Sequence, residues 1–236
     1  MRRFFVPSKN FYEHQIKLSL DESKHLREVL RLRSGDKVCV FDGEGNEHLC
    51  IVQEVGAKKD SSILRILQKT TPASPESELD LTLGVALLKG EKFDLIVQKA
   101  VELGVTELVP VLTKRGDSKN VRLERWQKIG IEAAKQSGRA KLMIISELRN
   151  FEGFAEDATG AKILFSERNG ESFSAIKADK KITAVIGSEG GWEDSEIEFA
   201  RTKSFQIITL KGRILRAETA AIAIAAVLQN RFGDMN

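Results

Sequence analysis

The sequence of 236 residues is poor in the groups that most often bind metals or form disulfides. Its two cysteines, Cys39 and Cys50, are too few for a disulfide framework or a zinc site, so we expect both to be reduced and structural. All three histidines precede residue 73. The rest of the chain therefore has no imidazole for Ser-His-Asp or metal-dependent chemistry, and we expect no bound metal.

Other missing patterns narrow the function classes further. No stretch approaches the roughly 18–20 consecutive apolar residues that a membrane span needs, and MRRFFV at residues 1–6 is too short for a secretory signal. We therefore expect a cytoplasmic protein with no membrane partner. The chain also lacks the G-x-G-x-x-G of nicotinamide-binding domains and the G-x-x-x-x-G-K-[ST] of phosphate-binding loops.

The composition changes at TTPASPESE, residues 70–78, where two of the four prolines lie among serines and threonines. We interpret this segment as a linker between a domain of residues 1–72 and a domain of residues 73–236. The first has 13 Lys and Arg against 10 Asp and Glu, and the second has 24 against 24. The net charge of +3 thus belongs to the first domain, but this bias alone does not indicate nucleic-acid binding.

The pattern of the first domain predicts a small β-barrel with one helix. Strand-like runs occupy residues 37–42, 47–55 and 62–69. The helix is predicted in DESKHLREVLRL, where Ser19 and Glu22 have the spacing of a capping box.

The second domain alternates strand-like and helical runs. The strands are predicted at 79–87, 105–112, 142–146, 161–166, 182–187 and 205–210, and the helices at 91–103, 122–137, 193–203 and 217–231. Gly104 stands where a helix is expected to end, and Trp126 lies among apolar helical positions typical of a core. The alternation predicts an α/β fold with a mostly parallel sheet, whose ligands bind at the carboxyl ends of the strands.

Two late loops carry the chemical signal. In GSEGGWEDSE, after the strand at 182–187, glycines surround Ser188 and Glu189, and glycine lets a backbone approach a ligand closely. The carboxylate of Glu189 would repel a phosphate, so we expect the loop to bind another kind of ligand. Alternatively, Glu189 is only an acidic residue before a helix N-terminus. The second loop, LKGRILRAETAA, leads into a helix rich in small residues and by itself is also typical of an ordinary βα connection.

Together, the two loops resemble the signature of the SPOUT methyltransferases. More narrowly, the chain resembles the bacterial family that methylates N3 of a uridine in 16S ribosomal RNA, and the resemblance extends over essentially its full length. RRFFV, HLREVLRLRSGDKVCVFDGEG, KGEKFDLIVQKAVELGVTELVPV and EAAKQSGR carry it alongside the loops. The chain departs from the usual pattern at Ser188, Trp192, Lys211-Gly212 and Ala217.

The resemblance implies a knotted (trefoil) α/β methyltransferase domain in residues 73–236 and a PUA-like β-barrel in residues 1–72. It implies a homodimer that binds S-adenosylmethionine where the loops after residues 165, 187 and 210 converge, and that acts on 16S rRNA or the 30S subunit. The residues expected to bind the cofactor are Glu167, Gly187, Gly190, Gly191, Leu210, Gly212, Ile214, Leu215 and Thr219. The alternative is a non-catalytic knotted RNA-binding factor in ribosome assembly.

Arg216 and Glu189 are the predicted catalytic residues. A guanidinium at position 216 would stabilise charge on the uridine oxygens as N3 loses its proton; alternatively, Arg216 pairs with Glu218 and only holds the loop. Glu189 is the candidate base, and the identity of the base stays open.

The predicted RNA-binding residues are basic and lie mainly in the first domain: Arg2, Arg3, Lys24, Arg27, Arg31 and Arg139. Lys24, Arg27 and Arg31 have helical spacing that places them on one face, which either contacts phosphates or is merely solvated. Glu132, Gln136 and Arg139 stand at positions i, i+4 and i+7, so they lie on one face of the predicted helix. With the family resemblance, this arrangement indicates a role at the site or in the dimer; alternatively, it is only the polar end of a helix that stops at Gly138.

Overall fold

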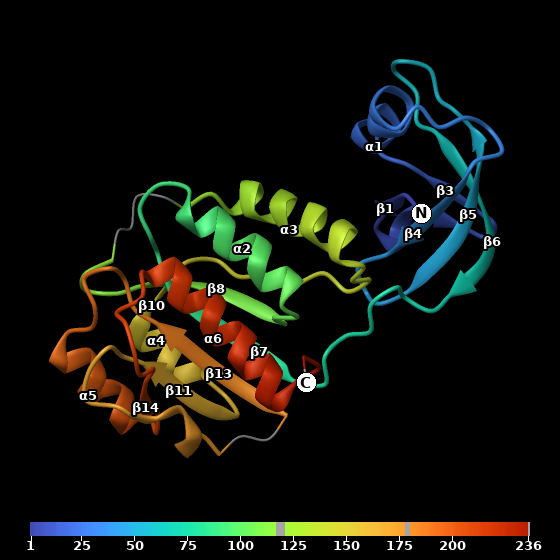
Figure 1. Cartoon of the computed structure of the whole chain (residues 1–236). Coiled ribbons are helices and arrows are strands. Elements are labelled where there is room, and N and C mark those ends of the chain that lie inside the picture. Colours follow the sequence, from blue (N-terminus) through green and yellow to red (C-terminus); the bar gives the residue numbers. More distant parts are fainter. Residues whose placement is uncertain (117–120, 178–179, 236) are drawn as a thin grey trace. The chain divides into compact units, whose positions relative to one another are not determined.

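The computed structural model describes residues 1–116, 121–177 and 180–235, which form two compact units. Unit 1 contains Met1–Glu76 and also Ile131–Leu142, whereas unit 2 contains Ser77–Gly130 and Met143–Asn236. Figure 1 shows the elements of each unit. No helix in the described part of the chain is long and apolar enough to cross a membrane.

Unit 1 is built on a curved six-stranded sheet with the order β1-β4-β5-β6-β3-β2 (Figure 1). Its strands are β1 (Arg3–Phe5), β2 (Phe11–Tyr12), β3 (Gln15–Lys17), β4 (Lys37–Phe41), β5 (Glu47–Glu54) and β6 (Ile63–Thr70). β1 pairs with β4 in parallel, and the other pairs are antiparallel. Alternate residues of these strands face one core, among them Phe4, Val38, Val40 and Leu64.

The helical segment of unit 1 differs from the predicted helix. Ser19 is the N-cap as predicted, since its hydroxyl accepts a hydrogen bond of 3.1 Å from the Glu22 amide. However, α1 (Leu20–Lys24) continues as a π-helix, η2 (His25–Val29), and Arg31 follows it with a left-handed φ of 53°. The prediction that Lys24, Arg27 and Arg31 share one face of a regular helix is therefore wrong.

Unit 2 contains an all-parallel sheet with the order β10-β8-β7-β13-β11-β14-β12, and β9 pairs with β8. The strands are β7 (Asp80–Ala86), β8 (Glu107–Leu112), β9 (Ile144–Ile145), β10 (Arg149–Asn150), β11 (Ala161–Phe165), β12 (Glu171–Ser172), β13 (Lys181–Ile186) and β14 (Gln206–Thr209). The predicted parallel α/β fold is confirmed. Because β11 lies between β13 and β14, the chain passes β11 on its way from β13 to β14; the trefoil knot itself stays a prediction.

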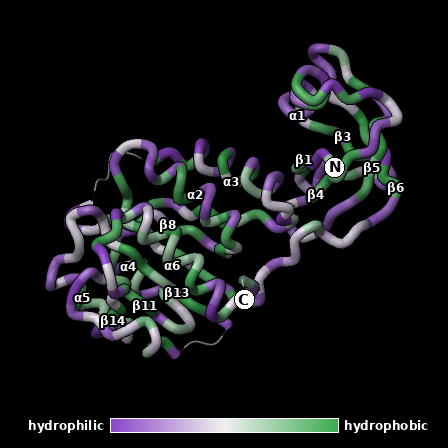
Figure 2. Tube along the Cα trace, viewed as in Figure 1, coloured by the Kyte–Doolittle hydropathy of each residue, from purple (hydrophilic) through white to green (hydrophobic). Residues whose placement is uncertain are grey.

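Helices cover both faces of this sheet (Figure 1). The helices of unit 2 are α2 (Lys92–Glu102), α4 (Phe151–Asp157), α5 (Asp194–Thr202), α6 (Ala217–Phe232) and the first half of α3 (Leu123–Ser137), whose second half belongs to unit 1. α2 lies against α6, and α6 packs on β13, whereas α4 and α5 pack together over the other face. Figure 2 shows that hydrophobic residues follow β13, β11 and α6, which agrees with their burial.

Two local predictions are confirmed in unit 2. Gly104 follows α2 with φ 71°, the left-handed conformation that favours glycine after a helix. Trp126 is buried, with its ring 4.4 Å from that of Phe93 and its indole nitrogen 3.0 Å from the Asp94 carboxylate. These contacts join the first half of α3 to α2.

Candidate active site

A cavity of about 450 Å³ lies at the carboxyl ends of β11, β13 and β14. Three loops and the start of α6 line it, and they contribute Phe165, Ser166, Glu167, Ile186, Gly187, Ser188, Glu189, Gly190, Gly191, Trp192, Leu210, Gly212, Arg213, Ile214, Leu215, Arg216, Ala217, Ala220 and Ile224. The predicted convergence of the loops after residues 165, 187 and 210 is therefore confirmed. Carboxyl strand ends are where α/β sheets bind ligands.

The cavity brings together most of the residues that the sequence predicted for the site. Eight of the nine expected cofactor ligands line it, as do both predicted catalytic residues, Glu189 and Arg216. Thr219 is the exception, since its side chain is exposed and does not line the cavity. The cofactor contacts of the eight residues stay a prediction.

Trp192 closes one side of the cavity from within the fold. It is 1% exposed, its indole nitrogen donates to the Phe165 carbonyl oxygen at 2.9 Å, and its ring lies 4.9 Å from that of Phe151. A Cβ at Gly187 would come within 2.9 Å of this indole nitrogen. Gly187 is therefore required by its own loop, because a side chain there would displace Trp192.

Arg115, which follows β8, forms hydrogen bonds with the glycine loop, the segment of residues 187–193 between β13 and α5. Its guanidinium donates to the Gly190 carbonyl oxygen at 2.7 Å and to the Glu193 carboxylate at 2.6 Å, and the Ser188 hydroxyl donates to the Arg115 carbonyl oxygen at 3.1 Å. A Cβ at Gly190 would meet the Arg115 side chain at 3.0 Å. A side chain at position 190 would therefore displace the Arg115 side chain and disturb its hydrogen bonds to the loop.

Glu189 points to a partner that sequence patterns did not reveal. Its carboxylate accepts from Lys92 Nζ at 2.5 Å, and this hydrogen bond is the main cause that raises the pKa of Lys92. The N-cap of α5 is Glu193, in a reciprocal capping box with Glu196. Glu189 thus lies four residues before this N-cap, so the alternative of an acidic residue at the helix N-terminus applies to Glu193 rather than to Glu189.

Arg216 is the N-cap of α6, with φ −64° and ψ 152°. Its side chain is exposed and lines the cavity. The Arg216 side chain has neither an ion pair nor a hydrogen bond with any of the described residues, whereas the Glu218 carboxylate lies 3.8 Å from Lys92 Nζ. The alternative that Arg216 pairs with Glu218 to hold the loop is therefore not what the structure contains.

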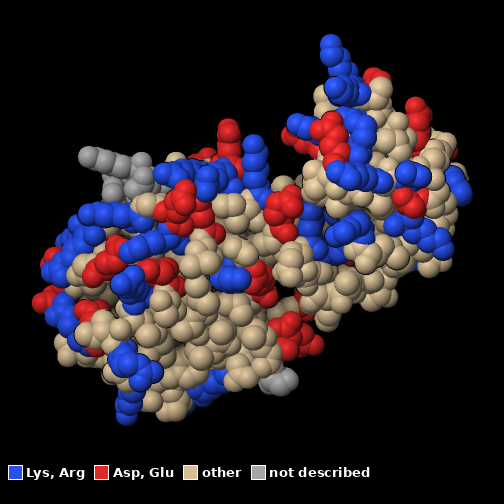
Figure 3. Space-filling view, turned by 45° about the horizontal axis from the view of Figure 1, so that its top comes forward, with Lys and Arg blue, Asp and Glu red and all other residues tan. Residues whose placement is uncertain are grey.

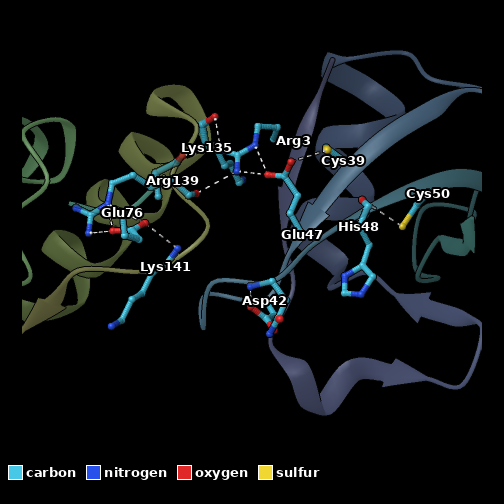
Figure 4. A network of polar contacts seen from close by, with 12 residues as sticks. Arg3, Cys39, Asp42, Glu47, His48, Cys50, Glu76, Lys135, Arg139 and Lys141 are labelled. Atoms are coloured by element: carbon cyan, nitrogen blue, oxygen red, sulfur yellow. Dashed lines mark hydrogen bonds and ion pairs between the residues drawn. The ribbon is translucent and has the colours of Figure 1, made fainter. Parts of the chain in front are cut away.

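Two of the basic residues predicted to bind RNA are committed to structural contacts in unit 1 (Figure 4). Arg3 pairs with the buried carboxylate of Glu47 and donates to the carbonyl oxygens of Ala134 at 2.9 Å and Arg139 at 3.1 Å. Arg139 is 5% exposed and pairs with Glu76 at 2.7 Å. These contacts attach residues 131–142 to the sheet of unit 1.

The other four predicted RNA ligands differ in how far they are engaged. Arg27 donates to the carbonyl oxygens of Gly56 at 2.7 Å and Ala57 at 2.9 Å. Arg2, Lys24 and Arg31 are exposed, and their side chains make no hydrogen bond or ion pair within the described part of the chain. Of the four, these three are the ones that keep their charge free for an anionic partner.

Arg2 also lines a smaller cavity of about 220 Å³, which lies wholly within unit 1. The other residues around it are Met1, Arg3, His25, Leu30, Glu132, Lys135 and Gln136. Glu132 and Gln136, which the sequence predicted to have a role at a site or in a dimer, therefore lie beside one of the free basic residues.

The site and fold define an α/β ligand-binding domain joined to a small β-sheet domain, and comparison with known proteins identifies the class. A family model described as "RNA methyltransferase domain" matches residues 75–229, and one described as "RNA methyltransferase PUA domain" matches residues 19–64.

Curated relatives and solved structures agree with these matches. The chain is 31% identical to ribosomal RNA small subunit methyltransferase E of Rickettsia conorii, over 95% of this chain and 94% of the relative. It is 35% identical to the Synechocystis protein of that name, over 95% and 76%. The crystal structure of that methyltransferase from Neisseria gonorrhoeae, bound to S-adenosyl methionine, matches with a TM-score of 0.92 at 32% identity and covers 100% of both chains.

The chain thus belongs to the RNA methyltransferase family, with a PUA domain attached. The predicted family resemblance is confirmed.

Proposed function

We propose that this protein transfers the methyl group of S-adenosylmethionine to N3 of a uridine in 16S ribosomal RNA. The observation that carries the proposal is the three-loop cavity, in a chain that matches a structure bound to S-adenosyl methionine along its full length. The names of the relatives support small-subunit ribosomal RNA as the substrate.

The residues of the cavity fit this cofactor. Glu167 and Glu189 place carboxylates at its wall, which suits a cationic ligand with hydroxyl and ammonium donors and disfavours a polyphosphate. Leu210, Ile214 and Leu215 supply apolar surface for an adenosine. When bound there, the cofactor supplies an electrophilic methyl group on a positively charged sulfur.

Arg216 has the role that the chemistry of uridine requires. N3 of uridine carries a proton at neutral pH, and its removal leaves negative charge on O2 and O4. The free guanidinium of Arg216, at the mouth of the cavity, donates to these oxygens and stabilises that charge. Glu189 orients cofactor donors; its pairing with Lys92 makes it a weaker candidate for the base.

Unit 1 contributes RNA binding through Arg2, Lys24 and Arg31, whose charges are free. Acidic side chains are interspersed with basic ones on the face shown in Figure 3, so we assign RNA contact to these individual residues and not to one uniform basic surface.

A homodimer in the cytoplasm completes the proposal. Ile214 is 90% exposed and Leu215 is 38% exposed, although both are large and apolar and belong to a cavity loop. Such residues are typical of a covered interface, and a second copy of the chain would cover them beside the cofactor. Ile214→Asp is expected to shift the mass measured by light scattering from dimer to monomer.

The activity is tested by incubating the purified protein with tritiated S-adenosylmethionine and with 30S or 50S subunits from a strain that lacks this protein. We expect label in the 16S RNA of the 30S subunit alone. Cofactor binding without label in any RNA would favour a non-catalytic assembly factor.

A further inference from the structure

Lys92, the first residue of α2, contacts one carboxylate that lines the cavity and a second one at the start of α6. Its ammonium nitrogen lies 2.5 Å from the Glu189 carboxylate in the glycine loop after β13. It also lies 3.8 Å from the carboxylate of Glu218 in the first turn of α6. Since Arg216 and Ala217 line the cavity at the start of the same helix, Lys92 joins the glycine loop to that start.

Glu218 depends on this ammonium group for its charge compensation. Its Oε2 atom is buried and has no hydrogen-bond donor within the described part of the chain. A buried carboxylate oxygen without a donor is costly unless a cation lies close to it. Lys92 supplies that cation at 3.8 Å, so the single positive charge of Lys92 is shared between two acidic residues.

Arg216 is a second cation close to Lys92. It lies two positions before Glu218 and close enough to Lys92 for its charge to lower the Lys92 pKa, whereas Glu189 and Glu218 raise it. With both carboxylates already near Lys92, the Arg216 guanidinium has no ion pair with the described residues. The unpaired Arg216 side chain thus coexists with the Lys92 contacts.

We propose that Lys92 is a positioning residue: it sets the gap between the glycine loop and α6 for the cofactor, and it keeps Arg216 unpaired for the RNA base. The inference rests on the proposed function and deepens it, because it names a residue outside the cavity that controls both cofactor affinity and the methyl-transfer step.

Lys92→Met removes the ammonium group and keeps most of the side-chain volume. We expect S-adenosylhomocysteine, titrated by calorimetry, to bind roughly two- to fivefold more weakly, the range that corresponds to an exposed ion pair. The difference is expected to shrink in 1 M salt, because the Debye length falls to about 3 Å. Lys92→Arg is expected to recover the affinity.

The second role is read from kcat at saturating cofactor and RNA. Lys92→Met is expected to lower kcat about tenfold, since Glu218 then competes for Arg216, a cost of the order of one hydrogen bond to a charged group. Adding Glu218→Gln to Lys92→Met removes the competing charge and is expected to restore most of kcat. A purely structural role for Lys92 predicts no such recovery.

Lys99→Met is the matched control, since Lys99 lies on the same helix, is 35% exposed where Lys92 is 36% exposed, and pairs with Glu102 at 2.7 Å. It is expected to keep wild-type affinity and kcat. Equal binding by the wild type and Lys92→Met at low salt, or an equal loss in Lys99→Met, would overturn the inference alone. A wild-type protein that binds no cofactor would overturn the proposed function together with it.

Discussion

The indole nitrogen of Trp192 donates a hydrogen bond of 2.9 Å to the carbonyl oxygen of Phe165, so the glycine loop is tied to the end of β11. Both residues line the cavity. The bond therefore couples the stability of the loop to the shape of the site.

Trp192→Phe keeps an aromatic ring but removes this donor. We expect a loss of about 1–2 kcal/mol in unfolding free energy, because the Phe165 carbonyl loses a buried partner, together with weaker cofactor binding. Urea unfolding and calorimetry measure the two effects. Trp126→Phe loses an indole hydrogen bond to Asp94 away from the cavity; it should cost stability but leave cofactor affinity unchanged. Unchanged affinity in Trp192→Phe would remove the proposed coupling.

Arg216→Ala tests the catalytic assignment. Loss of one donor to a developing negative charge typically lowers kcat about 10²–10³-fold, and cofactor affinity is expected to stay near that of the wild type. Arg216→Lys should recover only part of the rate, because a point charge lacks the planar pair of donors. Single-turnover methylation at saturating cofactor and RNA measures the effect. Near-normal turnover in Arg216→Ala would show that another group stabilises the charge.

The basic residues of unit 1 fall into two classes, one expected to affect RNA binding and the other expected to affect stability. Lys24→Ala combined with Arg31→Ala is expected to weaken RNA binding and to reduce the salt slope of log K by up to about two. Arg27→Ala should instead lower stability, since its guanidinium donates to the Gly56 and Ala57 carbonyl oxygens. Filter binding over a range of salt, with a urea melt of each variant, distinguishes them. An unchanged slope for the double variant would mean that its charges are only solvated.

The two thiols are expected to be unreactive in the native protein. Burial raises the pKa of Cys39 to about 11 and that of Cys50 to about 12, above the ordinary value of 9.0. At pH 8 only about a thousandth or less of either is thiolate, so labelling by a disulfide reagent should follow unfolding. The folded state binds these protons more tightly; their contribution to stability is therefore complete below pH 9 and is lost as pH rises toward 11–12. Rapid labelling of native protein at pH 8 would contradict the burial.

The parallel sheet and the late loops could be predicted because their signals are local. β13 is mostly apolar and ends in Ala-Val-Ile, and the glycines and acidic residues that follow it mark the end of a strand. α4 was missed because seven residues, FEGFAED, are too few to show a helical period.

The remaining features depend on residues far apart in the chain. The change from α1 to a π-helix accompanies the contacts of Arg27 with the carbonyl oxygens of Gly56 and Ala57, which the good helix formers around residue 27 do not reveal. Likewise, the amphipathic pattern of α2 does not show that Lys92 meets Glu189, 97 residues later. The attachment of residues 131–142 to unit 1 through Arg3 is invisible for the same reason.

The central claim is tested most directly by identifying the methylated nucleoside. The 16S RNA from a strain that lacks this protein is treated with the purified protein and S-adenosylmethionine as 30S subunits, digested, and analysed by mass spectrometry against synthetic methyluridine isomers. The account predicts one new 3-methyluridine, present with the wild type and strongly reduced with Arg216→Ala. A methyl group on carbon 5, on the ribose or on another base, or no new methylation by a protein that binds the cofactor, would contradict it.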